Sequence, residues 1–153
     1  MIRVWRIITK RRMNNAFTGE GARQYGGRWN RKGIPVVYTA KSPALALLEM
    51  LVQDEPLRAR YMIFPVDIPD RLRVESIEVK QLPKNWKDPE QIESLQELGS
   101  NWAISKKSPV LAVPSAVIPI ETNYLINPLH RDFPLIKIGK PVSFFTDRRL
   151  LKE

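Results

Sequence analysis

An arginine and a glutamate are the first candidates for chemistry in this sequence, because the residues around each are unusual for a charged side chain on the surface. Arg28 follows two glycines in the segment 26–30 (GGRWN). Glycine permits close backbone approach and a positive φ, and a guanidinium can bind two phosphate oxygens at once. The pattern is typical of an anion site, although a surface ion pair would use the same arginine.

Glu49 lies in the apolar run 44–52 (ALALLEMLV), which Ser42 and Pro43 precede as a helix cap and a first helical residue. Nearly every neighbour is apolar, so we expect a helix that is buried over most of its circumference. A buried carboxylate costs free energy unless it is paired or used in chemistry. The alternative is that Glu49 occupies a narrow polar stripe facing water, and the pattern leaves both readings open.

Two later segments add polar groups in apolar surroundings. Ser115 ends an apolar stretch in 113–117 (VPSAV), where its hydroxyl could point into a cleft or cap a turn. The segment 123–128 (NYLINP) supplies two amides and an aromatic ring. His130 is the only histidine, which rules out a site of paired histidines for a metal. We interpret it as a turn or structural residue.

Several common classes of site are missing from the sequence. There is no cysteine, no GxGxxG or Walker A motif and no carboxylate cluster with metal-ligand spacing, so we expect no metal site. No run approaches the ~20 apolar residues of a membrane span. The first twelve residues lack an apolar core and a cleavage site, so we expect no signal peptide. These features favour a cytoplasmic protein.

The formal net charge of +9 is placed unevenly. Residues 1–60 contain twelve Lys/Arg and four Asp/Glu, whereas residues 61–153 contain thirteen and twelve. The first part could therefore face nucleic acid, a phosphate-bearing small molecule or an acidic protein. A solvated basic surface is the simpler alternative.

The elements that must position these residues are short. A long ordered loop is expected over Lys10–Lys32, of the kind that usually carries function. A second helix should begin at Asp88-Pro89, with Ile92, Leu95 and Leu98 on one face. The patterns predict strands over Val4–Thr9, Val36–Thr39, Arg60–Ile68, Arg73–Val79 and Val110–Val113, with Ala116–Ile120 continuing the last, and a hairpin of Leu135–Ile138 and Val142–Phe145 around Gly139. We therefore expect one compact, mixed α/β or α+β domain over residues 1–153, built of short, mostly antiparallel strands and a few helices.

The order of these segments resembles the RES-domain family, which is named for an Arg, a Glu and a Ser. The matching pieces are WRI at 5–7, GEGAR at 19–23, GGRWN at 26–30, GIPVVYTA at 33–40, ALLE at 46–49, VPSAV at 113–117 and NYLINP at 123–128. They cover essentially the whole chain. The resemblance implies Arg28, Glu49 and Ser115 as catalytic residues, and Tyr38 as the aromatic between the first two.

The same resemblance implies a fold similar to ADP-ribosyltransferase toxins and NAD as the substrate, with no separate cofactor. It also implies a toxin of a type II toxin–antitoxin system, with an Xre-type helix-turn-helix antitoxin that alone contacts DNA. Self-association, as a dimer within that complex, is a further expectation. Near the amino end the family commonly has an aromatic-Arg pair, which corresponds here to Trp5 and Arg6.

The expected reaction is cleavage of the N-glycosidic bond of NAD by water or phosphate, which would deplete cellular NAD. Arg28, helped by Arg6, would bind the pyrophosphate, and Glu49 would stabilise the positive charge that develops on the ribose. The predicted substrate contacts are completed by Tyr38 at the nicotinamide, by Ser115 and Asn127 on an amide or ribose hydroxyl, and by Trp29 and Asn30 in the arginine segment.

Three other functions stay open from the residues. An ADP-ribosyltransferase that modifies a cellular protein would use the same site. A basic RNA-binding module or ribonuclease toxin would suit the charged first part of the chain, although a second histidine for acid–base work on RNA is missing. An inactive family member would serve as an interaction protein, but the intact Arg, Glu and Ser argue against it.

Overall fold

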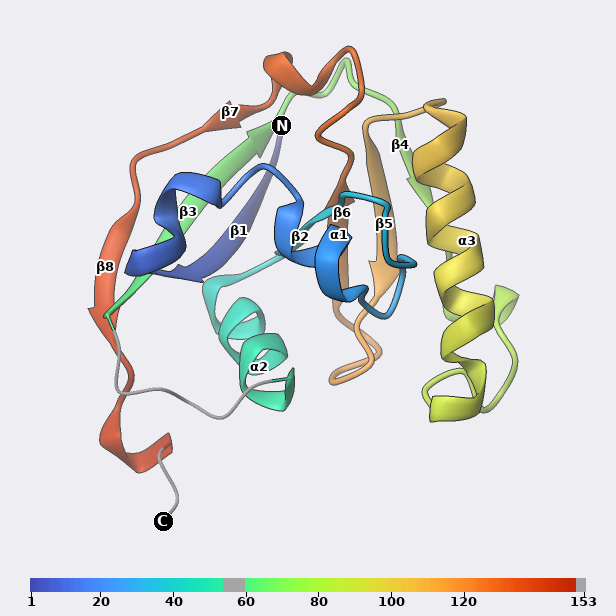
Figure 1. Cartoon of the computed structure of the whole chain (residues 1–153), viewed down its shortest axis with the longest axis horizontal. Helices are drawn as coiled ribbons and strands as arrows, with labels where there is room; N and C mark the ends of the chain where they lie inside the picture. Colours follow the sequence, from blue (N-terminus) through green and yellow to red (C-terminus); the bar gives the residue numbers. More distant parts are fainter. Residues whose placement is uncertain (54–59, 151–153) are drawn as a thin grey trace.

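In the computed structural model, one eight-stranded sheet forms the centre of the molecule, and helices cover parts of it (Figure 1). The structure describes residues 1–53 and 60–150. The strands are β1 (Ile2–Thr9), β2 (Val37–Ala40), β3 (Arg60–Ile68), β4 (Val74–Ser76), β5 (Val110–Pro114), β6 (Thr122–Ile126), β7 (Lys137–Ile138) and β8 (Val142–Phe145). They lie in the order β4-β5-β6-β2-β1-β3-β7, with β8 also paired to β3.

Three α-helices and five short 3-10 helices complete the described part of the chain. They are α1 (Glu20–Tyr25), α2 (Pro43–Gln53), α3 (Ile92–Ser105), η1 (Lys10–Asn15), η2 (Val79–Gln81), η3 (Pro89–Gln91), η4 (Phe133–Leu135) and η5 (Arg148–Leu150). Only β4 and β5 pair in parallel among the described strands. The expected α+β class with mostly antiparallel strands is confirmed.

Alternation along the strands sends neighbouring residues to opposite faces of the sheet. Val110 and Ile126 enter one apolar cluster, whereas their neighbours Leu111 and Leu125 enter a second cluster beneath α3. A third, small cluster joins Ala40 of β2 to Leu45 and Ala46 of α2. Figure 1 shows α3 beside β4 and β5, and α2 next to the ends of β1 and β2.

Several sequence-based expectations were wrong in detail. The segment Lys10–Lys32 contains η1 and α1, both too short to show an apolar period. Leu98 of α3 is 44% exposed, because the buried face instead runs through Leu95, Gly99, Trp102 and Ala103. The strand expected over Arg73–Val79 is only β4. The strand β6 was not predicted at all.

The closing hairpin was also wrong, because β7 and β8 both pair with β3 and not with each other. Pro65 lies in β3 between the two pairings, and its carbonyl accepts a hydrogen bond from the Gly139 N–H at 2.8 Å. A Cβ on Gly139 would lie 2.8 Å from the Pro65 ring, so glycine is needed at this crossing.

A tight turn replaces the strand expected over Ala116–Ile120. The Ser115 N–H donates to the Glu121 carbonyl, and the Glu121 N–H donates to the Ile118 carbonyl. These bonds reverse the chain, so that β5 and β6 pair directly as an antiparallel hairpin. The turn lies at the same end of the molecule as α2 (Figure 1).

Candidate active site

Glu49 lies on the inward face of α2. The helix begins as predicted, because the Ser42 hydroxyl accepts the Leu45 N–H at 3.1 Å and Pro43 follows it. Leu45 and Ala46 are buried, and Glu49 comes four and three residues after them on the same face. Val52 is 63% exposed, so the helix is not buried over most of its circumference as we expected. Glu49 itself is half-buried and not on an outer polar stripe.

The fully buried Ser115 contacts Glu49 directly. Its hydroxyl donates to Glu49 Oε1 at 2.5 Å and accepts the N–H groups of Val117 and Ile118, each at 3.0 Å. A serine hydroxyl has one proton and two lone pairs, and all three are used here. Ser115 therefore joins the β5–β6 turn to α2 and orients the carboxylate.

Asn123 is a second donor to the same oxygen and was missed from the sequence. Its Nδ2 lies 2.9 Å from Glu49 Oε1. Asn123 stands opposite Val113 in the β5–β6 pair, so it flanks the turn together with Ser115. Reading 116–120 as a strand concealed this proximity. A turn signal at the two prolines Pro114 and Pro119 was the clue that could have revealed it.

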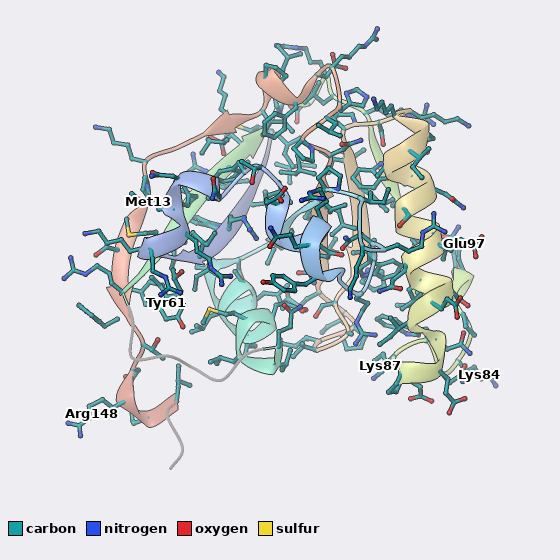
Figure 2. The ribbon with its side chains drawn as sticks, viewed as in Figure 1. Met13, Tyr61, Lys84, Lys87, Glu97 and Arg148 are labelled. Atoms are coloured by element: carbon teal, nitrogen blue, oxygen red, sulfur yellow. The ribbon has the colours of Figure 1, made fainter. Side chains whose placement is uncertain are left out.

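Arg28 lies at the tip of a narrow turn whose backbone is closed by Gly27 and Asn30. The Gly27 N–H donates to the Asn30 carbonyl at 3.0 Å. Gly26 enters the turn at φ +74°, a conformation that favours glycine. The half-buried Arg28 side chain makes one hydrogen bond to the described residues, from Nη1 to the carbonyl of Lys87 at 3.5 Å. Figure 2 labels Lys87 near the start of the long helix.

The Tyr38 hydroxyl makes two hydrogen bonds to this turn. It donates to Asn30 Oδ1 at 2.6 Å and accepts the Trp29 N–H at 3.1 Å. Burial raises the pKa of Tyr38, so the phenol stays protonated at neutral pH and can fill both roles. A Cβ on Gly27 would lie 2.6 Å from this hydroxyl, which leaves room only for glycine.

The helix α3 supports the turn from the other side. Gln96 Nε2 donates to the Gly27 carbonyl at 2.9 Å. Gly99 lets α3 approach the backbone, because a Cβ there would lie 1.8 Å from the Trp29 carbonyl oxygen. The turn that carries Arg28 is therefore fixed by β2 and α3 together, while its guanidinium has only one long contact.

Arg28 and Glu49 line one pocket of about 310 Å³. Its other lining residues are Val52 and Gln53 at the end of α2, and Ala116 and Val117 of the β5–β6 turn. The volume lies at the lower end of the range of small-molecule sites. A cation and a carboxylate thus line the same partly apolar space.

The other predicted site residues are not brought to this pocket. Trp29 packs in the cluster beneath α3, with its ring centroid 6.4 Å from that of Trp86. Asn30 is fully buried, and its Nδ2 donates to the carbonyls of Ala22, Arg31 and Ile34. Asn127 donates to the Ala103 carbonyl and accepts the Leu129 N–H. The two amide side chains hold backbone in place.

Arg6 leaves β1 on the opposite face from Ile7, which packs near α2. Its guanidinium donates to the carbonyls of Ala16 at 2.7 Å and Tyr38 at 3.1 Å. Burial lowers the pKa of Arg6 to about 10, which still leaves it positively charged at neutral pH. The structure gives Arg6 a bracing role between η1 and β2.

His130 is buried in the turn after β6, where its Nδ1 accepts the Asp132 N–H at 3.0 Å. This contact is that of a turn residue. Among the residues that the structure describes, no three His, Cys, Asp or Glu side chains are grouped closely enough to hold a metal. Within 1–53 and 60–150, no helix is long and apolar enough to cross a membrane.

Comparison with known proteins places this arrangement in a family. The sequence profile of the RES domain matches residues 3–147. The chain belongs to the RES-domain family. Two of the three residues that the resemblance implied as catalytic, Glu49 and Ser115, are in direct contact.

Two relatives match this chain over nearly their whole length. A protein of Photorhabdus laumondii named Toxin Res is 36% identical over 152 residues, covering 97% of both chains. A Sphingobium protein named Prs ADP-ribosylating toxin is 40% identical over 159 residues, covering 97% of this chain and 96% of its own.

A solved structure has a similar fold. The match is to a structure described as the Mycobacterium tuberculosis MbcT–MbcA toxin–antitoxin complex, with a TM-score of 0.75 and 20% identity. It covers 94% of this chain and 84% of that one.

Proposed function

We propose that this protein is the toxin of a toxin–antitoxin system and that it cleaves the N-glycosidic bond of NAD. The observation that carries the proposal is that Arg28 and Glu49, from separate elements, line one pocket with Ser115 hydrogen-bonded to the carboxylate. The names of the relatives support the toxin role. NAD is a substrate here, and no other cofactor is required.

The chemistry of NAD fits these two side chains. Its pyrophosphate carries two negative charges, and its nicotinamide leaves as a neutral molecule while positive charge develops on the ribose. A neutral leaving group needs no strong general acid. The reaction therefore does not require a histidine in the pocket, and His130 lies buried outside it. The site must supply an anion-binding cation and a carboxylate near the ribose.

Arg28 would bind the pyrophosphate, because a guanidinium pairs with two phosphate oxygens in a planar arrangement. Glu49 would accept a ribose hydroxyl, stabilise the cation and orient the attacking group. Ser115 would act through Glu49, since all its hydrogen-bonding capacity is already used. The other predicted residues would act from outside the pocket. Trp29 would pack beneath α3, and the surrounding backbone would be held by Arg6, Asn30, Tyr38 and Asn127.

The bond from the ribose to nicotinamide breaks with its electron pair going to the ring nitrogen. In hydrolysis, water attacks the ribose carbon and loses a proton, which yields ADP-ribose. In phosphorolysis, inorganic phosphate attacks instead, which yields the ribose 1-phosphate ester of ADP-ribose.

The test is an assay of nicotinamide release by the purified protein, with and without inorganic phosphate. Glu49→Gln and Arg28→Ala should each lose activity while keeping the wild-type circular dichroism spectrum. For Glu49→Gln, we expect a loss of about 10²–10³-fold, as for other preorganised electrostatic contacts. Full turnover by either variant would remove that residue from the mechanism.

Transfer of ADP-ribose to a cellular protein is the second candidate. It is favoured by the 40% identical relative named Prs ADP-ribosylating toxin. The bond broken is the same, and only the nucleophile differs. Mass spectrometry of a bacterial lysate treated with the toxin and NAD distinguishes the two, since transfer leaves ADP-ribose on a protein and hydrolysis leaves it in solution.

We also propose an antitoxin partner of the Xre helix-turn-helix type, which would cover the pocket in the cytoplasm and contact DNA on behalf of the complex. The fold match to a toxin–antitoxin complex supports such a partner. Apolar side chains near the pocket are exposed: Val52 at 63%, and Ile120, in the same turn as Ala116, at 95%. Co-expression followed by size-exclusion chromatography tests both the complex and the proposed toxin dimer within it.

A further inference from the structure

The contact with Glu49 allows only one orientation of the Asn123 amide. An ionised carboxylate only accepts hydrogen bonds, so the Asn123 amide must present its nitrogen to Oε1, at 2.9 Å. This orientation turns the amide oxygen, Oδ1, in the other direction. The contact therefore determines where both polar atoms of the amide lie.

The amide oxygen is left without compensation. Asn123 Oδ1 is buried and has no hydrogen-bond partner among the described residues. Burying an unpaired acceptor is unfavourable, and most buried polar atoms avoid it. A residue that only packs would not need this amide. Its orientation satisfies Glu49 and leaves its own oxygen unpaired, which indicates that the nitrogen is the useful atom.

The two donors act on the same carboxylate oxygen. Ser115 Oγ and Asn123 Nδ2 both donate to Oε1, from the two sides of the β5–β6 turn. Two hydrogen bonds to one oxygen fix the rotation of a carboxylate group, which a single bond leaves partly free. No described residue donates to Oε2, the oxygen that remains for a ligand in the pocket.

We propose that Asn123 is a positioning residue, which together with Ser115 holds Glu49 by Oε1 and directs Oε2 to the substrate. This inference rests on the proposed function, because it assigns Glu49 the same task. Asn123 would not touch NAD. Its contribution would be to the chemical step, since a misplaced carboxylate weakens contacts made in the transition state more than those made with the bound substrate.

The test compares Asn123→Ala with Asn123→Asp in the nicotinamide-release assay at one pH. Asn123→Ala should lower kcat about tenfold with little change in KM, as expected for one lost hydrogen bond to a charged group. Asn123→Asp should be worse than alanine, although it keeps the size and shape of asparagine. It replaces a donor with a second carboxyl beside Oε1, and like charges repel at this distance. A packing role predicts the reverse order, with aspartate the milder change.

Thermal stability supplies a second readout. Because Asn123→Ala removes a buried unpaired acceptor, we expect its melting temperature to change little while kcat falls. The control is Ser108→Ala. Ser108, like Ser115, is fully buried, and its hydroxyl donates to Glu75 and accepts from Trp102. That variant should lose stability and keep its turnover per folded molecule.

The outcomes separate the inference from the proposed function. If the wild-type protein releases nicotinamide and both Asn123 variants match it, the positioning role is wrong and the function stands. If the wild-type protein releases none, the function fails. In that case, a crystal structure of Asn123→Ala tests the positioning role separately. The role is wrong if the Glu49 carboxylate has not moved and still bonds to Ser115.

Discussion

The two charged residues of the pocket are held in opposite ways. Arg28 has a fixed backbone, closed by Gly27 and Asn30 and supported by Tyr38 and Gln96, but its guanidinium has one contact of 3.5 Å. Glu49 lies on a helix with an exposed apolar side, but its carboxylate is fixed by donors at 2.5 and 2.9 Å. Arg28 is positioned by the hydrogen bonds of its backbone turn, and Glu49 is positioned by the hydrogen bonds to its own carboxylate.

The difference fits the tasks that we propose. A guanidinium that can adjust its position on a fixed backbone can bind a flexible pyrophosphate. A charge developing on one ribose carbon is best stabilised by a group that is already in place, because reorganisation during the reaction costs free energy. The comparison therefore predicts that small changes of length harm Glu49 more than Arg28.

The largest effect is expected for Glu49→Asp. Aspartate keeps the charge but is one methylene shorter, so it cannot hold the bonds to Ser115 and Asn123 and also reach the substrate. We expect kcat for nicotinamide release to fall about 10²–10³-fold, close to the effect of losing the carboxylate. The matched control is Glu97→Asp on the outer side of α3, labelled in Figure 2, which should behave as the wild type. Near-normal turnover by Glu49→Asp would show that the carboxylate is not preorganised.

A smaller and different effect is expected for Arg28→Lys. Lysine keeps the positive charge and a long side chain but loses the planar pair of donors. We expect KM for NAD to rise about tenfold with kcat little changed, since binding of the pyrophosphate is similar in the ground and transition states. Steady-state kinetics measures this split, with Arg23→Lys, in an exposed ion pair with Glu20, as the control. A fall in kcat with an unchanged KM would reverse the comparison.

The smallest effect on rate, and a clear effect on stability, is expected for Gly27→Ala. The new methyl group would lie 2.6 Å from the Tyr38 hydroxyl and 2.8 Å from Asn30 Oδ1. We expect the free energy of unfolding to fall by about 1–3 kcal/mol, as for other overpacked sites, and KM to rise as the turn shifts. Chemical denaturation measures the first quantity.

Gly21 provides the matched control for that change. A Cβ there meets nothing within 4 Å, and the residue lies within α1. Gly21→Ala should leave activity unchanged and raise stability by up to about 1 kcal/mol, because alanine favours the helix and restricts the unfolded chain. Equal stability of the two alanine variants would contradict the close packing beneath the Arg28 turn.

The sequence by itself predicted much of the local structure. Ser42 and Pro43 start α2 because a cap and a proline act within one helical turn, and the bounds of β3 follow from its own pattern and Pro69. The expectation of a few helices with mostly antiparallel strands came from these local patterns. The order of the motifs indicated the family, which the sequence profile then confirmed.

Tertiary structure decided what these elements do to one another. Ser115 and Asn123 reach Glu49 only because the β5–β6 turn folds against α2, more than sixty residues away along the chain. The identity of a serine or asparagine does not say whether its donor goes to backbone, substrate or another side chain. Of the two amides in 123–128, the sequence predicted only Asn127 at the site. The assembled sheet instead sends Asn127 to the Ala103 carbonyl and Asn123 to the carboxylate. Spacing along the chain reports helices, strands and caps, whereas the direction of a hydrogen bond between distant segments depends on how the sheet is assembled.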